Sequence, residues 1–186
     1  MAKLYFRYAA MNAGKSTAML QVAHNYEEQG RSVALYTAAV DDRYGLGKVT
    51  SRLGIQREAR VFDRDFNFLT ALTGTTASCV LLDEAQFLTA DQVVQLHRLA
   101  QLKGVPVICY GLRTDFQGKP FEGAAHLLSL ADDIEEMKTI CLCGRKATMN
   151  IRVDGEGRRI REGEQVSIGG NASYKQACAK CFYAEA

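Results

Sequence analysis

Residues 12–17 have the sequence Asn-Ala-Gly-Lys-Ser-Thr, which limits the chain to a small set of folds. A short, aromatic-rich run at 3–8 predicts a strand before this segment, and the apolar pattern over 16–29 predicts a helix after it. Such a loop surrounds an anion with backbone N–H groups, and Lys15 adds a positive charge. The Ser16 hydroxyl suits a Mg²⁺ ion. We therefore predict a phosphate-binding loop, with a chance Gly-Lys-Ser sequence as the alternative.

The loop departs from the complete phosphate-loop pattern at one position. The pattern has glycine where this chain has Ala9. Alanine is tolerated there as long as its φ angle stays negative, because only positive φ strongly favours glycine. The substitution therefore leaves the prediction in place but makes the path of the loop uncertain.

Two adjacent acids, Asp83 and Glu84, follow the apolar run at 78–82. This run predicts a strand buried on both faces, and a carboxylate at its end is suited to hold Mg²⁺ beside a phosphate-binding loop. Glu84 then either orients a water, as in an ATPase, or takes a proton from a substrate hydroxyl, as in a kinase. The alternative is a pair of solvated carboxylates or a helix cap.

Predicted strands and helices alternate along the first 138 residues. Further strands are expected at 33–37 and 105–110, and Thr89 and Gln92 have the spacing of a capping box for a helix that ends near Gly104. This alternation predicts an α/β fold with a parallel sheet and helices on both faces. The glycine-rich segment 41–54 is expected to be a mobile loop.

Four cysteines dominate the remainder of the chain, residues 139–186, which we predict to be a small second domain. Cys141 and Cys143 form one close pair, and Cys178 and Cys181 form another. Two such pairs supply the tetrahedral thiolate site that Zn²⁺ prefers, and zinc would stabilise a unit too small for a large core. Buried free thiols or a disulfide are the alternatives. Cys79 and Cys109 fall in predicted strands and are expected to be core thiols.

Charge and hydropathy limit the partners. Lys and Arg exceed Asp and Glu by 23 to 21, a net charge of +2, which argues against a dedicated nucleic-acid binder. No apolar run approaches the roughly 18 residues of a membrane span. We expect a cytoplasmic protein that binds neither membrane nor nucleic acid.

Taken together, the motifs resemble those of the type II thymidine kinases. The resemblance rests on the loop at 9–16, on Asp-Asp-Arg-Tyr at 41–44, on Leu-Asp-Glu-Ala-Gln-Phe at 82–87 and on Tyr-Gly-Leu-Arg-Thr-Asp-Phe at 110–116. Ile-Gly-Gly-Asn-Ala-Ser-Tyr at 168–174 and the four cysteines complete it. It implies a P-loop NTPase (RecA-like) sheet with a C-terminal zinc-binding domain that carries a lasso loop.

The resemblance also implies a reaction, in which ATP phosphorylates the 5′-hydroxyl of thymidine to give dTMP. Glu84 matches the general base, and Arg43 matches an arginine near the phosphates. Ser16 and Asp83 match magnesium ligands, with Asp83 acting through water. The residues implied to bind ATP are Ala9, Ala10, Met11, Asn12, Ala13, Gly14, Lys15, Ser16, Thr17, Asp83 and Gln86.

The thymine pocket, by the same resemblance, lies between the two domains. Residues expected at the base are Met11, Phe87, Leu112 and Phe116, together with Ile168, Gly169, Gly170 and Tyr174 of the lasso. Zinc bound by the cysteines would anchor both ends of the lasso excursion. Family members form homotetramers and are inhibited by dTTP, so both properties are expected here.

Three other functions remain open from sequence. A P-loop ATPase or switch protein would hydrolyse ATP without a nucleoside. A zinc-ribbon nucleic-acid binder would need a basic face and salt-dependent binding. A kinase of the same fold for another nucleoside would differ only in its pocket residues.

Overall fold

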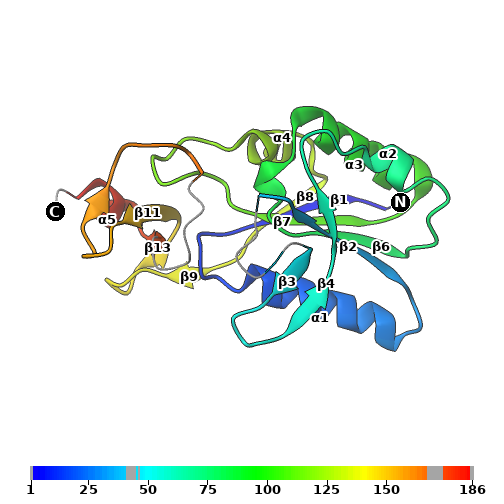
Figure 1. Cartoon of the computed structure of the whole chain (residues 1–186), viewed down its shortest axis with the longest axis horizontal. Coiled ribbons are helices and arrows are strands. Elements are labelled where there is room, and N and C mark those ends of the chain that lie inside the picture. The colour runs from blue at the N-terminus through cyan, green and yellow to red at the C-terminus, as the bar shows by residue number, and fades with distance from the viewer. Residues whose placement is uncertain (1, 41–44, 46, 167–173, 185–186) are drawn as a thin grey trace.

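The computed structural model describes residues 2–40, 45, 47–166 and 174–184. A six-stranded sheet forms its centre, with the strand order β5-β2-β6-β7-β1-β8 and parallel pairing throughout. The strands are β1 (Leu4–Tyr8), β2 (Val33–Ala38), β5 (Arg60–Phe62), β6 (Cys79–Leu82), β7 (Val107–Gly111) and β8 (Asp133–Glu136). The parallel sheet predicted from sequence is confirmed (Figure 1).

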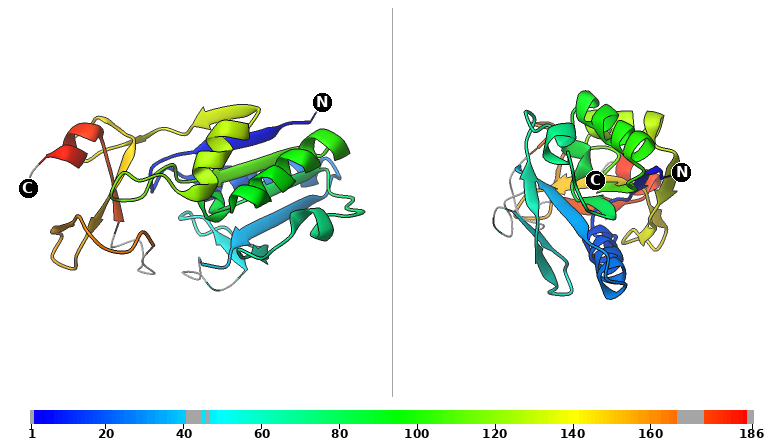
Figure 2. Two further views of the ribbon diagram at one scale, coloured as in Figure 1. Left: turned by 90° about the horizontal axis from the view of Figure 1, so that it is seen from above. Right: turned by 90° about the vertical axis from the view of Figure 1, so that its right-hand side faces the viewer.

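Helices cover both faces of this sheet, as predicted. Helix α1 (Lys15–Glu28) lies on one face, and α2 (Phe68–Ala71), α3 (Ala90–Lys103) and α4 (Glu122–Leu130) lie on the other (Figure 2). The fully buried β6 serves both cores, since Cys79 and Leu81 pack toward α1 while Val80 and Leu82 pack toward α3 and α4. Burial on both faces explains why this strand is continuously apolar in the sequence.

The predicted helix and strand positions agree with the structure to within two residues, and the capping box at Thr89 and Gln92 is present. Gly104 ends α3 in a left-handed conformation, with φ of 68°. The two edge strands of the sheet, β5 and β8, were not predicted. β5 has only three residues, and β8 is the mostly acidic, exposed segment Asp-Ile-Glu-Glu, so neither has the apolar pattern of a buried strand.

The expectation of a mobile loop over 41–54 is wrong for its second half. Strand β3 (Lys48–Thr50) pairs antiparallel with β4 (Gln56–Glu58). The side chain of Val49 on β3 is buried in the core that α1 covers. Arg57 on β4 donates two hydrogen bonds, of 2.9 and 2.6 Å, to the carboxylate of Glu27 on α1. The β3–β4 hairpin is therefore fastened to α1, while residues 41–44 and 46 lie outside the described residues.

The C-terminal part of the chain extends beyond one end of the main sheet (Figure 1). The hairpin of β9 (Thr139–Ile140) and β10 (Lys146–Ala147) leads into an antiparallel sheet in which β11 (Met149–Val153) lies between β12 (Arg159–Ile160) and β13 (Tyr174–Ala177). Helix α5 (Ala179–Tyr183) follows. The domain boundary at residue 138 stays a prediction. Within the described residues, no helix has the length and apolar character needed to cross a bilayer.

Candidate active site

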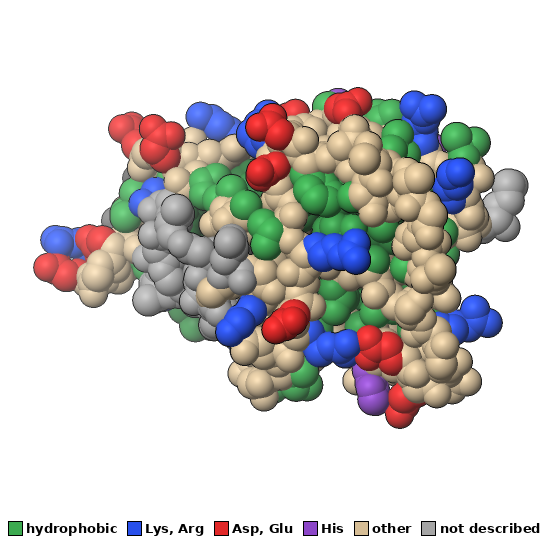
Figure 3. Space-filling view, turned by 45° about the vertical axis from the view of Figure 1, so that its right-hand side comes forward, with side chains coloured by type: hydrophobic (Ala, Val, Ile, Leu, Met, Phe, Trp, Pro, Cys, Tyr) green, Lys and Arg blue, Asp and Glu red, His purple; other side chains and the backbone are tan. Residues whose placement is uncertain are grey.

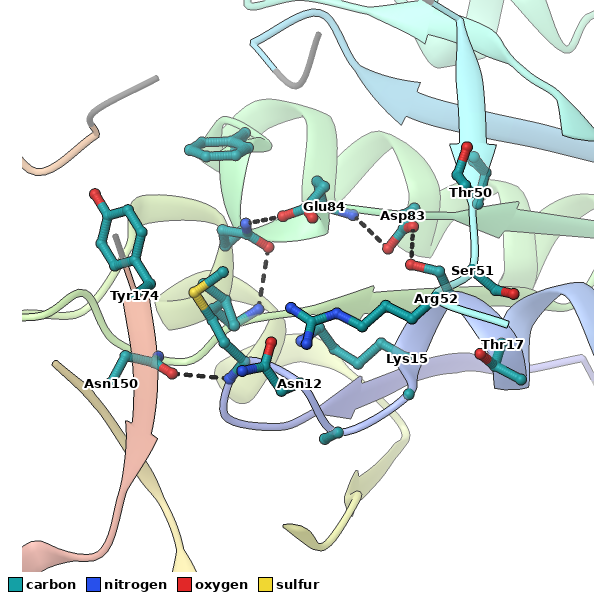
Figure 4. Close-up of a pocket in the computed structure, with 18 of the residues that line it drawn as sticks. Asn12, Lys15, Thr17, Thr50, Ser51, Arg52, Asp83, Glu84, Asn150 and Tyr174 are labelled. Carbon is teal, nitrogen blue, oxygen red and sulfur yellow. Dashed lines mark hydrogen bonds between the residues drawn. The ribbon is translucent and has the colours of Figure 1, made fainter. Parts of the chain in front are cut away.

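A cavity of about 690 Å³ opens where β1, β6 and β7 end, between the main sheet, the β3–β4 hairpin and the C-terminal sheet. Its lining has two parts, one polar and one rich in aromatic and aliphatic side chains. The polar part includes Asn12, Lys15, Ser16, Thr17, Thr50, Arg52, Asp83 and Glu84, and the apolar part includes Met11, Phe87, Leu112, Phe116, Phe121 and Tyr174. Glu84 lies between these two groups (Figure 4).

The predicted phosphate loop forms the base of the polar part. Asn12 and Gly14 have positive φ angles, 66° and 81°, which turn the loop sharply before α1 begins at Lys15. The first turn of α1 carries no acidic residue and receives no side-chain cap, so its N-terminal N–H groups are available to an anion. The Lys15 ammonium donates to the carbonyl of Ala10 across the loop, at 3.3 Å. The loop is thus built to bind an anion.

The first two residues of the loop, Ala9 and Ala10, are buried behind the cavity and do not line it. Ala9 does not adopt a positive φ, so alanine fits at this position as expected, and its N–H donates to the Gly111 carbonyl at 3.2 Å. Ala10 packs against the cysteines of the C-terminal part. These two residues therefore anchor the start of the loop in the protein interior.

Side chains of the C-terminal sheet fix the middle of the loop. The Met11 N–H donates to the side-chain oxygen of Asn150 at 2.8 Å, and the Asn12 amide donates to Gln176 at 2.7 Å. Asn150 is only 3% exposed and its amide also donates to the Thr114 carbonyl at 3.2 Å. The two parts of the chain therefore meet at the phosphate loop, a link that the sequence did not predict.

Asp83 and Ser16 come together as expected. The Ser16 hydroxyl donates to the Asp83 carboxylate at 2.7 Å, although β7 separates the strands that carry the two motifs. Burial raises the pKa of Asp83 to about 6, and the nearby Glu84 charge adds to the effect. A buried carboxylate beside a hydroxyl is an oxygen donor set that fits Mg²⁺, and a bound cation would stabilise the ionised form.

Glu84 occupies an unusual backbone conformation directly after β6. Its φ and ψ are 53° and 37°, a left-handed geometry that costs a non-glycine residue about 1 kcal/mol or more. Because of this geometry, the short 3₁₀ helix η1 (Ala85–Phe87) begins directly after Glu84, and the Gln86 side chain lies close to that of Glu84. The Gln86 amide donates to the Glu84 carboxylate at 2.5 Å. Residues held in strained conformations commonly belong to functional sites.

The apolar part contains every predicted base-contacting residue that the structure describes, namely Met11, Phe87, Leu112, Phe116 and Tyr174. The Phe116 and Tyr174 rings are 6.5 Å apart, and the Arg152 guanidinium lies over both. Phe87 packs edge-on against Phe121 at 5.7 Å. Flat aromatic surfaces at this end suit a planar base.

Several predicted residues cannot be placed. Arg43, Ile168, Gly169 and Gly170 lie outside the described residues. The structure instead adds the hairpin residues Thr50, Ser51 and Arg52, which sequence analysis missed. The Arg52 side chain extends into the cavity that Lys15 also lines (Figure 4). The polar Thr-Ser-Arg run before Gly54 was the available signal, but the glycine-rich context favoured a plain loop.

The four predicted zinc ligands converge in the C-terminal part of the chain, where two of them form a buried cluster with Ala10 of the phosphate loop. The sulfur atoms of Cys141, Cys143, Cys178 and Cys181 all lie within 4.8 Å of one another, and we call this group the cysteine cluster. Tetrahedral Zn–S bonds imply sulfur separations of about 3.8 Å, and Cys143 and Cys178 are 3.5 Å apart. Backbone N–H groups lower the pKa of Cys141 to about 6, while neighbouring thiols raise that of Cys181 to about 12. Adjoining thiolates repel, so a cation is needed to keep all of them ionised.

The charge distribution on one face of the molecule bears on nucleic-acid binding, which would need a basic patch. On the face shown in Figure 3, Lys and Arg side chains are interspersed with Asp and Glu and do not form one basic patch. This distribution agrees with the small net charge of +2.

Comparison with known proteins identifies related chains over nearly the whole length. The family model described as thymidine kinase matches residues 2–182. A thymidine kinase of Chromobacterium violaceum is 66% identical over 183 residues, which cover 98% of this chain and 99% of that protein. Thymidine kinases of Shewanella oneidensis and Albidiferax ferrireducens are 54% and 55% identical, over 98% of this chain and 97% and 93% of their own lengths.

Proposed function

Since this chain belongs to the thymidine kinase family, we propose that it transfers the γ-phosphoryl group of ATP to the 5′-hydroxyl of thymidine. The observation that carries the proposal is the position of Glu84, in one cavity between a phosphate-binding loop and an aromatic pocket. A carboxylate at that point can act on the hydroxyl group of a nucleoside. The nucleobase would be held in the aromatic pocket, and the triphosphate would be held at the phosphate-binding loop.

The polar part of the cavity is suited to the donor. ATP would lie with its triphosphate over the phosphate loop, where backbone N–H groups and Lys15 neutralise its charge. Arg52 reaches the same region from the β3–β4 hairpin, and we assign it to the phosphates as a second cation. Phosphoryl transfer depends mainly on such positioning and charge neutralisation, because there is little covalent chemistry for the protein to perform.

Ser16 and Asp83 are the residues that would hold Mg²⁺, Ser16 directly and Asp83 through water. When bound, the ion reduces the negative charge on the β- and γ-phosphates. The roles of Arg43 at the phosphates and of Zn²⁺ in the cysteine cluster remain proposals from the family resemblance, and the close grouping of the four sulfurs supports the second.

Glu84 would take the proton from the 5′-hydroxyl while the hydroxyl oxygen attacks the γ-phosphorus. The bond between that phosphorus and the β–γ bridging oxygen then breaks, and ADP leaves. A general base placed in this way contributes about 10²–10⁴-fold. Met11, Phe87, Leu112, Phe116 and Tyr174 would hold the thymine ring, together with the lasso residues Ile168, Gly169 and Gly170 expected from sequence. The 5-methyl group adds about 1–3 kcal/mol of selectivity over deoxyuridine.

The test uses γ-labelled ATP, Mg²⁺ and each deoxynucleoside in turn. The wild-type chain is expected to label thymidine best, and Glu84→Gln is expected to lower kcat by about 10²–10⁴-fold. Glu28→Gln is the matched control, since Glu28 is exposed on α1 and pairs with the neighbouring His24, away from the cavity. Its rate should equal that of the wild type.

Three results would contradict the proposal, and a fourth would change its substrate. Label that stays out of thymidine would exclude the substrate, and ATP hydrolysis without nucleoside would favour an ATPase. Full activity of Glu84→Gln would exclude the general base. Preference for another nucleoside would keep the kinase but change its acceptor.

Two further proposals come from the family resemblance alone. A homotetramer would be seen by light scattering coupled to size-exclusion chromatography. Feedback inhibition by dTTP would appear as inhibition competitive with both substrates, because a nucleoside triphosphate can occupy the acceptor pocket and the phosphate loop together.

A further inference from the structure

We propose that Gln86 is a positioning residue that fixes the Glu84 carboxylate against the wall of the nucleoside pocket. The inference rests on the proposed function of Glu84. It changes the expectation for Gln86 itself, because the sequence resemblance placed this residue among those that bind ATP.

Both ends of the Gln86 side chain are engaged by the protein. Its oxygen accepts the Leu112 N–H at 3.0 Å, and its amide nitrogen donates to Glu84 at 2.5 Å. The Leu112 N–H can bond only to an acceptor, so it determines which end of the carboxamide is oxygen. The nitrogen must then face the Glu84 carboxylate. The orientation is therefore imposed by the backbone at the end of β7.

The surroundings confine this side chain, which also borders the cavity. Gln86 is 2% exposed. A Cβ atom on Gly111 would lie 2.8 Å from its side-chain oxygen, and one on Gly123 would lie 2.9 Å from its backbone carbonyl oxygen. Two glycines thus allow β7 and α4 to close around η1. A side chain confined in this way holds its partner in one place, which is the requirement for a general base.

The connection also joins the two halves of the reaction. Leu112 lines the pocket where the nucleobase is expected to bind. Its N–H donates a hydrogen bond to the Gln86 side chain, which in turn holds Glu84. The same short piece of backbone would thereby position both the nucleoside and the carboxylate. Gln86 borders the cavity, but because both ends of its side chain are engaged by the protein, its role in this arrangement is to act through Glu84.

The experiment compares two substitutions at Gln86 with a matched control on α3. Gln86→Glu keeps an acceptor for Leu112 but replaces the donor by a carboxylate that repels Glu84. Gln86→Met removes both bonds at similar size. Gln95 is the control, because it is also buried, accepts the Phe68 N–H at 2.8 Å and donates to Asp91 at 2.6 Å, outside the cavity lining.

Steady-state kinetics and thermal unfolding are measured for every variant. We expect both Gln86 variants to lose about 10²-fold in kcat, with KM for ATP and thymidine within about threefold of the wild type. Gln95→Glu should unfold at a similarly lowered temperature and keep its kcat. In a Glu84→Gln background, Gln86→Glu should cost nothing further, since the group it positions is already absent.

The outcomes separate this inference from the proposed function. A wild-type chain that does not phosphorylate thymidine ends both. If the wild type is active, then unchanged kcat in a folded Gln86 variant overturns the positioning role alone. A raised KM for ATP with normal kcat would show that Gln86 binds the nucleotide, and additive losses in the double variant would show that it acts independently of Glu84.

Discussion

Replacement of Asn150 tests how the C-terminal sheet supports the phosphate loop. The Asn150→Ala substitution removes an acceptor from the Met11 N–H and a donor from the Thr114 carbonyl, in a side chain that is 3% exposed. Each backbone group left without a partner in the interior costs about 1–3 kcal/mol. Because the cavity lets water reach part of this region, we expect a total near the lower end, about 2–4 kcal/mol.

That loss should appear in both stability and ATP binding. For a chain of this size, about 2–4 °C per kcal/mol gives a lower unfolding midpoint by roughly 4–16 °C. Met11 belongs to the loop that would hold the triphosphate, so its release should also raise KM for ATP, by about tenfold if 1.4 kcal/mol of loop ordering is lost. Differential scanning fluorimetry and initial rates measure the two effects.

Asn25→Ala is the matched control, since Asn25 is exposed on α1 and accepts a hydrogen bond from the exposed Gln21. It should change neither quantity. A midpoint for Asn150→Ala within about 1 °C of the wild type would refute the energetic argument. A lowered midpoint with an unchanged KM for ATP would refute the role in holding the loop.

Further predictions concern the thiols, the hairpin and pH. In the metal-loaded protein a thiol reagent should find Cys79 and Cys109 unreactive, because burial raises their pKa, to about 11 for Cys79; a chelator should expose the cysteine cluster alone, and more than four reactive thiols in the folded chain would contradict this. Arg52→Gln should raise KM for ATP and lower kcat, about tenfold in kcat/KM, without changing the unfolding midpoint; equal kinetics would exclude Arg52 from the phosphates. Arg57 lowers the pKa of Glu27 below its ordinary 4.5, so their pair stabilises the fold above that pH and is lost as pH falls through the lowered pKa. Arg57→Met should therefore cost up to about 1 kcal/mol at neutral pH and nothing in acid, and urea titrations at both pH values that give equal losses would contradict the pairing.

Local sequence was sufficient to locate the two main motifs of the candidate site. The phosphate loop and the Asp83-Glu84 pair were predictable because each depends on a few consecutive residues at the end of a strand. Their meeting was predictable only as far as the parallel sheet was, since the 2.7 Å contact between Ser16 and Asp83 spans 67 positions and an intervening strand. The strong alternation of apolar strands and amphipathic helices supplied that sheet.

Features that depend on distant partners were missed. The β3–β4 hairpin has three residues per strand and draws its support from Val49 beneath it and from the bond between Arg57 and Glu27, 30 positions away. Asn150 is one polar residue in a short strand, and its partners lie 139 and 36 positions away. No local pattern distinguishes such residues from ordinary surface polar groups.

The left-handed conformation of Glu84 explains how two adjacent acids acquire different tasks. Asp83 ends β6, is 4% exposed and bonds to Ser16, so it faces the position expected for the cation. With φ of 53° at the next residue, the chain leaves the strand direction immediately, and Gln86 returns to bind the second carboxylate at the boundary with the aromatic pocket. An extended residue at this position would carry η1 away from β7 and would separate Gln86 from Leu112. Under the proposed function, the backbone strain at Glu84 would therefore be the structural condition for one carboxylate to serve the donor side while its neighbour serves the acceptor.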